Sequence, residues 1–179
     1  VLKQAAGQLG CNYEGFPLGE VQSMIGRWKN KLYFPEDARR HADTTFEATA
    51  AQLYEEYQTL LEMQNSLDFD DMLLLVYRLF TEHPDVLERY RETYQYSLID
   101  EYQDSNLVQE YLLSCISGEE EGRYNRFMVG DVKQSIYKFR LARPELFLEK
   151  YEAYGKAESK VQDGPAIAGK MQREMCPAV

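Results

Sequence analysis

Two adjacent carboxylates, Asp100 and Glu101, directly follow a short apolar run at residues 96–99 that is typical of a β-strand. Open parallel sheets bind ligands outside the carboxyl ends of their strands, so this strand would place both acids at a binding edge. There, one carboxylate can hold Mg²⁺ through water, and the other can polarise an attacking water. A simple polar turn is the alternative, but the polar side chains at 103–105 favour a site.

A second group of chemically capable residues follows another strand pattern, at residues 126–129. Gln134 offers an amide, which suits contact with a terminal phosphate oxygen or a bound water. Aromatic and basic side chains then alternate at Tyr137, Lys138, Phe139 and Arg140. Residues 123–143 hold six basic residues and one acidic residue, a net charge of +5. Aromatic faces beside cations are typical of a platform for single-stranded nucleic acid. An amphipathic surface segment with core aromatics is the alternative.

These two groups are positioned by a predicted strand–helix–strand unit. A helix capped by Ser105 and running through Ile116 separates the two strands. Such βαβ units are right-handed and parallel, so both strands should end on one edge of the sheet, with Asp100, Glu101 and Asp131. Because two strands do not make a stable open sheet, we expect further strands outside this chain.

The remaining sequence predicts two blocks and a tail. Residues 1–66 read as a helical block, with its strongest helix at about 46–64, capped by Thr44 or Thr45. Residues 67–152 read as the α/β part, in which Asp68 opens an apolar helix. Residues 153–179 show no clear element and read as a tail, with disorder as one interpretation.

Composition narrows the class of protein. The chain has 179 residues, 44% of them hydrophobic and 28% charged, the balance of an ordinary soluble domain. No apolar run approaches the roughly 20 residues of a membrane span, and the three cysteines are far apart, so we expect a cytoplasmic protein without membrane contact. The net charge of −10 excludes nucleic-acid binding by bulk charge. Any contact with nucleic acid must be local.

Three sequence blocks follow one another along the chain: LDFDDMLLL, LIDEYQDSNLVQ and MVGDVKQSIYKFRLARPELF. Together they resemble the UvrD/Rep/PcrA-type superfamily 1 DNA helicases, and the third block is most similar to the AddA helicase–nuclease subunit. The similarity covers about residues 20–152. It implies a helix-rich α/β fold, part of a RecA-like P-loop NTPase parallel-sheet domain (67–152, 1A-like) with a helical insertion (1–66, 1B-like).

The resemblance also implies a function, which is the central fragment of an ATP-dependent DNA helicase motor used in DNA repair or recombination. LIDEYQD matches the Walker B block of the family, so Asp100 would serve Mg²⁺ and Glu101 would activate the hydrolytic water. Gln134 matches the glutamine that senses the γ-phosphate of ATP and couples it to DNA. The implied cofactors are ATP and Mg²⁺. The implied partners are single-stranded and duplex DNA, the remaining helicase domains and a second helicase–nuclease subunit.

The same carry-over assigns a DNA contact. Tyr137 and Phe139 match aromatic positions that meet single-stranded DNA, with Phe139 in place of the tryptophan common there. Arg140 matches an arginine of the same block, which is linked to both DNA and nucleotide. Lys138, between Tyr137 and Phe139, is expected to be a further DNA-binding cation. Residues 68–70 match a block at the return from the helical insertion, for which we favour a structural role.

The sequence departs from the family pattern in one respect, and two alternative functions remain open. The sequence holds no G-x-x-x-x-G-K-[ST] phosphate loop, so this chain alone is expected to be inactive as an ATPase. Asp131, Lys133 and Asp100 also fit part of a metal-dependent nuclease site. A non-catalytic protein-interaction module, binding through acidic helices, is the second alternative.

Overall fold

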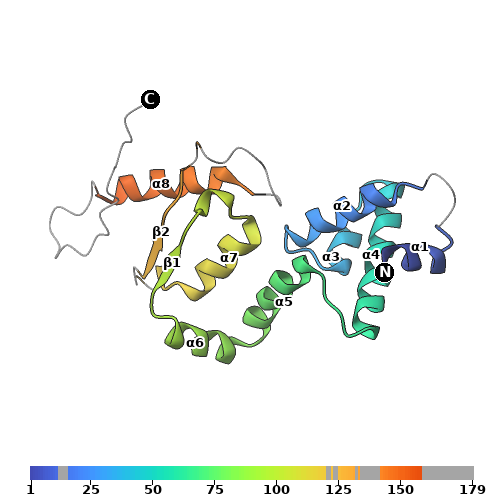
Figure 1. Ribbon diagram of the computed structural model, residues 1–179, viewed down its shortest axis with the longest axis horizontal. Coiled ribbons are helices and arrows are strands. Elements are labelled where there is room, and N and C mark those ends of the chain that lie inside the picture. The colour runs from blue at the N-terminus through green and yellow to red at the C-terminus, as the bar shows by residue number, and fades with distance from the viewer. Residues whose placement is uncertain (12–15, 120–121, 123–124, 132, 134–141, 159–179) are drawn as a thin grey trace.

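The computed structural model describes residues 1–11, 16–119, 122, 125–131, 133 and 142–158 (Figure 1). Within these residues the chain is rich in helices and contains one small parallel sheet. Figure 1 shows α1 to α4 gathered at one end, the sheet with α7 and α8 at the other, and α5 between them. The helix-rich α/β class expected from the sequence is therefore confirmed. No helix in this described part is long and apolar enough to cross a membrane.

The first end of the molecule is a cluster of helices around α4. Its elements are α1 (Leu2–Gln8), α2 (Leu18–Lys29), α3 (Pro35–Arg40) and α4 (Thr45–Met63). α4 contacts the other three, and small alanines on several of these helices let the backbones approach closely. The fully buried side chains of this core include Ala5, Val21, Ala38, Ala50, Leu53 and Tyr54.

The start of α4 shows why its boundary was predictable. The Thr44 hydroxyl accepts a hydrogen bond from the Glu47 backbone N–H at 3.1 Å, and the Glu47 carboxylate accepts one from the Thr44 N–H at 3.0 Å. This reciprocal capping box satisfies two backbone donors that the helix itself leaves unpaired. Thr44, rather than Thr45, is therefore the cap.

The junction between α2, α4 and α5 (Phe69–Glu82) is a buried group of charges, here called the Lys29 cluster: Lys29, Tyr57, Gln58, Asp68 and Asp71. The Lys29 ammonium lies 2.5 Å from Asp68 Oδ2 and 2.7 Å from Asp71 Oδ1. The Tyr57 hydroxyl donates to Asp68, and the Gln58 amide donates to Asp71, each at 3.0 Å. Asp68 also caps α5 by accepting the Asp71 N–H. Its observed contacts thus join helices and agree with the structural role favoured for this block.

The second end of the molecule is built around the sheet. Its elements are α6 (Pro84–Thr93), β1 (Ser97–Ile99), the 3₁₀ turn η1 (Tyr102–Asp104), α7 (Leu107–Ile116), β2 (Arg126–Met128) and α8 (Pro144–Glu158). A small core of Phe80, Val108 and Leu112 joins α5 to α7.

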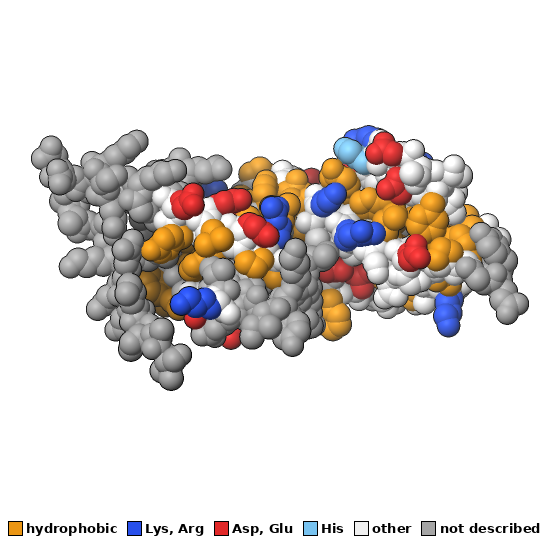
Figure 2. All heavy atoms as spheres, turned by 90° about the horizontal axis from the view of Figure 1, so that it is seen from above, with side chains coloured by type: hydrophobic (Ala, Val, Ile, Leu, Met, Phe, Trp, Pro, Cys, Tyr) orange, Lys and Arg blue, Asp and Glu red, His pale blue; other side chains and the backbone are white. Residues whose placement is uncertain are grey.

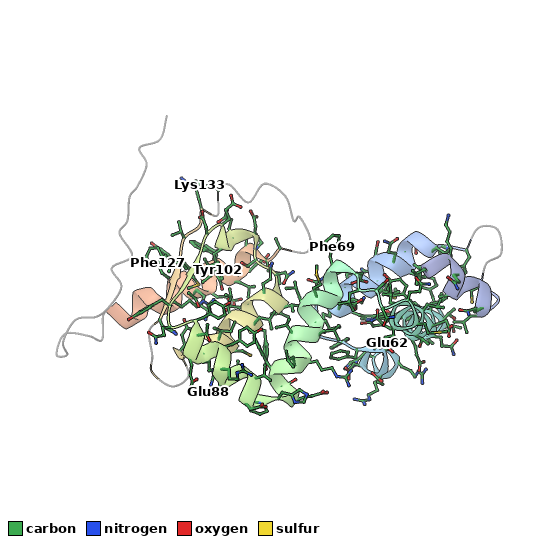
Figure 3. The ribbon with its side chains drawn as sticks, turned by 60° about the horizontal axis from the view of Figure 1, so that its bottom comes forward. Glu62, Phe69, Glu88, Tyr102, Phe127 and Lys133 are labelled. Atoms are coloured by element: carbon green, nitrogen blue, oxygen red, sulfur yellow. The ribbon has the colours of Figure 1, made fainter. Side chains whose placement is uncertain are left out.

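The two strands pair in parallel, with Ser97 opposite Arg126 and Ile99 opposite Met128. The predicted strand–helix–strand unit is thus confirmed, with each strand one residue shorter than expected. One face of the pair is bare, since Leu98 is 78% and Phe127 54% exposed. Figure 3 shows Phe127 on the outer side of the sheet and Tyr102 among the packed side chains.

Two boundaries differ from expectation. The N-cap of α7 is Asn106 and not Ser105, because Asn106 and Gln109 exchange side-chain-to-backbone hydrogen bonds at 2.9 and 3.0 Å. Ser105 has Val108 three residues later, which cannot complete such a box. α8 continues to Glu158, into the predicted tail, because Gly155 weakens a helix by only about 1 kcal/mol and does not end it.

Candidate functional site

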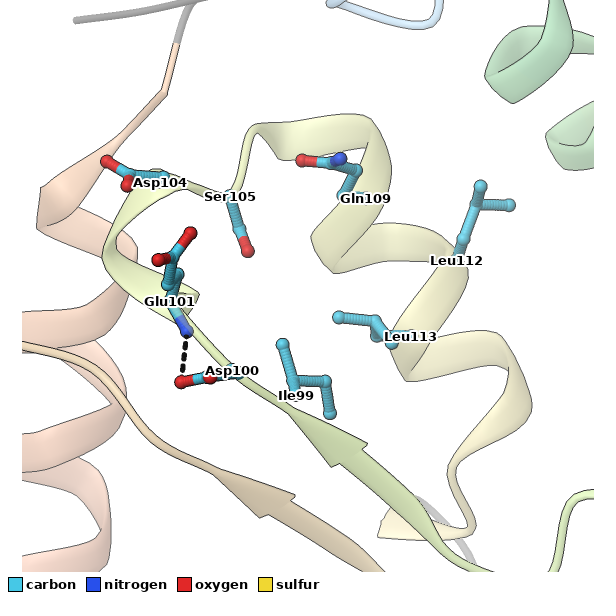
Figure 4. Close-up of a pocket in the computed structure, with 8 residues that line it drawn as sticks. All are labelled: Ile99, Asp100, Glu101, Asp104, Ser105, Gln109, Leu112 and Leu113. Atoms are coloured by element: carbon cyan, nitrogen blue, oxygen red, sulfur yellow. Dashed lines mark hydrogen bonds between the residues drawn. The ribbon is translucent and has the colours of Figure 1, made fainter. Parts of the chain in front are cut away.

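The two adjacent carboxylates lie where the sequence predicts, at the carboxyl end of β1 and at the mouth of a hollow of about 420 Å³ (Figure 4). The hollow lies between the strand end and the start of α7. It is lined by Ile99, Asp100, Glu101, Asp104, Ser105, Gln109, Leu112 and Leu113. Because β2 runs parallel to β1, Asp131 follows the same edge of the sheet. Acidic side chains from both strand ends therefore share one edge.

The backbone of this turn is unusual. Glu101 adopts a left-handed conformation, with φ +52° and ψ +38°, which residues other than glycine enter at a cost of roughly 1 kcal/mol. The Glu101 N–H donates to Asp100 Oδ1 at 2.9 Å, which orients the Asp100 carboxylate. In Figure 4 the two carboxylates leave the turn in different directions. The turn thus presents one acid beside the strand end and the other beside Asp104.

The chemistry of the donors fits a hydrated magnesium ion. Asp100, Glu101 and Asp104 are exposed, so their oxygens are open to hydrated ligands. No group of three or more His, Cys, Asp or Glu side chains that could hold a metal was found in the described ranges. Magnesium does not require one, since it is bound through one or two carboxylates together with water and substrate phosphates.

Beneath the turn lies a second buried group, here called the Arg126 cluster: Tyr102, Glu110 and Arg126. The Tyr102 hydroxyl donates to the Glu110 carboxylate and accepts from the Arg126 guanidinium at 3.2 Å, and Arg126 pairs with Glu110. Burial, followed by the bond to Glu110, raises the pKa of Tyr102, so its hydroxyl stays protonated and acts as a donor. The cluster ties the turn after Glu101 to α7 and β2.

Comparison with known proteins gives the site its context. A family model described as the UvrD/REP helicase N-terminal domain matches residues 2–155. The chain belongs to this family. The expected resemblance to UvrD/Rep/PcrA-type helicases is thereby confirmed.

Relatives of this UvrD/REP domain carry helicase names. The chain is 33% identical to the ATP-dependent DNA helicase PcrA of Leuconostoc citreum over 159 residues, which are 89% of this chain and 21% of that protein. It is 35% identical to the putative ATP-dependent DNA helicase YjcD of Bacillus subtilis, covering 88% of this chain and 20% of that protein. It is 45% identical to the exonuclease/helicase subunit RexA of Lactococcus lactis, and the match covers 59% of this chain and 9% of that protein. The chain thus spans about a fifth or less of the length of these relatives.

The second predicted group of this UvrD/REP domain is only partly placed. Gln134, Tyr137, Lys138, Phe139 and Arg140 lie outside the described residues, so their roles stay predictions. On the near side of this group, the Lys133 N–H donates to Asp131 Oδ1 at 3.0 Å. On its far side, the Arg143 N–H donates to the Ser105 carbonyl at 2.9 Å. The described flanks therefore both lie at the predicted sheet edge.

Sequence reasoning counted Gln103 among the polar side chains that favour a site but missed that it supports the turn, and it did not single out Tyr102. Tyr102 and Gln103 lie inside the quoted LIDEYQD block, yet their partners Glu110, Arg126 and Asp131 are 8 to 28 residues away. Glu110 on α7 and Arg126 on β2 form a buried pair, and no periodic pattern in the sequence predicts such a pair. Only the packed fold brings them together.

We expect Tyr102→Phe to lower the free energy of unfolding by about 1.5–3 kcal/mol, because the variant loses a buried hydrogen bond to a charged group. Urea unfolding would measure it. The matched control is Tyr96→Phe, whose side chain is 75% exposed and whose effect should stay within about 0.5 kcal/mol. Equal effects of the two variants would contradict a supporting role for the Tyr102 hydroxyl.

Proposed function

We propose that this chain is the central part of an ATP-dependent DNA helicase motor that couples ATP hydrolysis to translocation on single-stranded DNA and to duplex separation in DNA repair or recombination. The observation that carries the proposal is the placement of Asp100 and Glu101, adjacent and exposed, at the carboxyl edge of a parallel strand pair and at the mouth of a hollow. Membership of the UvrD/REP helicase N-terminal domain family supports it.

In this proposal, residues 67–152 are part of a RecA-like motor domain, residues 1–66 are part of its helical insertion, and 153–179 are a tail. The bare sheet face at Leu98 and Phe127 supports the first assignment, because helices cover both faces of the parallel sheet in a complete α/β domain. The greater length of the relatives supports it as well. The full-length motor would act in the cytoplasm, with further helicase domains and, as in helicase–nuclease enzymes, a second subunit.

The proposed chemistry assigns one task to each carboxylate. Asp100, oriented by its hydrogen bond from the Glu101 N–H, would hold Mg²⁺ through its water shell. Glu101, displaced from Asp100 by the left-handed turn, accepts a proton from the water that attacks the γ-phosphate. Bound Mg²⁺–ATP would supply the phosphoryl group and the charge neutralisation at this edge. Gln134 and Arg140 then contact the nucleotide, and Asp131 shares the edge.

The DNA contact is proposed for the segment that follows Asp131. Tyr137 and Phe139 would stack on bases of single-stranded DNA, and Lys138 and Arg140 would neutralise its phosphates. The face shown in Figure 2 has acidic and basic side chains interspersed over its coloured part. This distribution supports a local rather than a global nucleic-acid surface.

Binding of single-stranded DNA is accordingly expected to depend strongly on salt. The affinity should fall tenfold or more between about 50 and 200 mM salt, because a few phosphate contacts release counterions. In Lys138→Gln the slope of log affinity against log salt should flatten by about 0.7, the value of one contact to a single strand. Lys31→Gln, an exposed change on the distant helical block, is the matched control. An affinity that does not change with salt would contradict the proposed contact.

The proposed function is tested by strand separation with the full-length protein that carries this chain. A duplex with a single-stranded tail should be separated when ATP and Mg²⁺ are both present and left intact when ATP is replaced by a non-hydrolysable analogue. Failure to separate tailed duplexes of either polarity would contradict the proposal. Cleavage of the DNA strands without ATP would favour the nuclease alternative instead.

A further inference from the structure

Gln103 connects the two turns that meet at the sheet edge. Its side chain is only 4% exposed, although it lies two residues after the exposed Glu101. The side-chain carbonyl Oε1 accepts the backbone N–H of Asp131 at 3.0 Å. A backbone bond runs beside it, from the Tyr102 N–H to the Val129 carbonyl at 2.9 Å. The Val129 N–H also donates to the Ile99 carbonyl at 2.8 Å, so a buried side chain and backbone bonds together hold the two strand ends and their turns.

The packing around Gln103 shows independently how closely these turns approach. A Cβ atom at Gly130 would lie 2.5 Å from Gln103 Oε1 and 3.2 Å from the Gln103 backbone nitrogen. It would also lie 3.0 Å from the ring of Phe147 on α8. Real Cβ atoms do not approach other atoms as closely as 2.5 Å, so a larger residue at 130 would have to displace the Gln103 amide. The Gln103 amide is thus packed closely against the Gly130 turn.

The chemical type of this side chain also has a reason. The position supplies an acceptor for the Asp131 N–H, and an intramolecular hydrogen bond of this kind contributes about 0.5–1.5 kcal/mol. A carboxylate would also accept, but the same turn already carries Asp100, Glu101 and Asp104, and a fourth negative charge would be repelled by them. A neutral amide supplies the acceptor without that repulsion.

We propose that Gln103 is a positioning residue for ATP hydrolysis: it fixes the Gly130–Asp131 turn against the turn that carries Asp100 and Glu101, without touching substrate. The inference rests on the proposed function. Such positioning matters because a shift of about 1 Å between reacting groups can lower a rate by up to 10²-fold. The backbone bonds join the strand ends, and the acceptor oxygen of Gln103 extends this link to Asp131, beyond the end of β2.

The experiment compares Gln103→Met with Gln103→Glu in the full-length protein. Methionine keeps the length of the side chain but lacks the carbonyl, whereas glutamate keeps an acceptor oxygen. With saturating single-stranded DNA, kcat of Gln103→Met should fall by about 10- to 100-fold, while KM for ATP changes by less than about threefold. Gln103→Glu keeps an acceptor oxygen but adds a negative charge that Asp100, Glu101 and Asp104 repel, so it should recover only part of the lost kcat. The matched control is Gln52→Met on the exposed side of α4, which should leave kcat at the wild-type value.

A second readout follows the hydrogen bond itself and needs no catalysis. Amide hydrogen exchange at Asp131 should become at least about tenfold faster in Gln103→Met and stay near the wild-type rate in Gln103→Glu. A wild-type protein without ATPase activity would contradict the proposed function, whereas unchanged exchange at Asp131 would overturn the link itself. If the wild type hydrolyses ATP and Gln103→Met has the same kcat, or if both variants lose it equally, the inference is overturned.

Discussion

Glu101→Gln in the full-length protein is expected to lower kcat for ATP hydrolysis by about 10²- to 10⁴-fold, the usual contribution of a general base. Glutamine has almost the same shape and the same freedom to adopt the left-handed backbone at this position, so the turn should be kept. The amide cannot accept the proton of the attacking water. The loss should therefore appear in kcat, with KM for ATP changed much less.

The control for this variant is Glu149→Gln, an exposed glutamate on α8 that is remote in sequence from the turn. Steady-state phosphate release would measure both variants under the same conditions. A Glu101→Gln protein that keeps more than about a tenth of the wild-type rate would contradict the assignment of Glu101 as the base.

The second large effect concerns stability. Lys29→Ala is expected to lower the free energy of unfolding by about 3–5 kcal/mol, because it removes one partner of a buried ion pair and leaves the other charge uncompensated. Asp71 is only 1% exposed and lies 2.7 Å from the Lys29 ammonium. Denaturant unfolding measures the loss. Lys31→Ala, two residues along and exposed, should change stability by no more than about 0.5 kcal/mol.

The same cluster gives the stability a defined pH dependence. Burial alone would raise the pKa of Asp68, but hydrogen bonds from Lys29, the Asp71 N–H and Tyr57, together with the Lys29 charge, lower it below its ordinary value. The resulting stabilisation is present above the unfolded pKa of about 4 and is lost as the pH falls through the lower folded pKa. Asp70 acts in the opposite direction. Burial and the Asp68 charge raise its pKa, so its contribution to stability becomes more favourable as the pH falls.

Unfolding at pH 7 and pH 3 would therefore separate the wild type from Lys29→Ala. The wild type should lose stability between these values through Asp68, and the variant should lose less, because the lysine that lowers the Asp68 pKa is gone. Equal acid sensitivity of the two proteins would mean that the Lys29–Asp68 pair does not stabilise the fold.

Much of the fold follows from local patterns. Thr44 with Glu47, and Asp68 with Asp71, are reciprocal caps three residues apart, so their helix starts could be predicted. The parallel pairing followed from the length of the strand–helix–strand unit, and it placed Asp100 on the binding edge. The missed cap at Asn106 shows the limit, because Ser105 offers an equally good cap residue and only the partner three residues on decides between them.

The polar contacts between distant elements could not be predicted in this way. Lys29 and Asp68 are 39 residues apart, and Gln103 and Asp131 are 28 apart. Each is an ordinary polar residue in its own segment and meets its partner only when helices and strands pack. Sequence patterns record the period of an element, whereas these pairs depend on the distance between elements.

The sheet edge that carries Asp100 and Glu101 is proposed to hydrolyse ATP in response to single-stranded DNA. The most direct test is the rate of phosphate release by the full-length protein at saturating Mg²⁺–ATP, with and without single-stranded DNA. We expect the DNA to raise the rate at least about tenfold, and Glu101→Gln to abolish the increase. A rate that is the same with and without DNA, or an increase that survives in Glu101→Gln, would contradict this central claim.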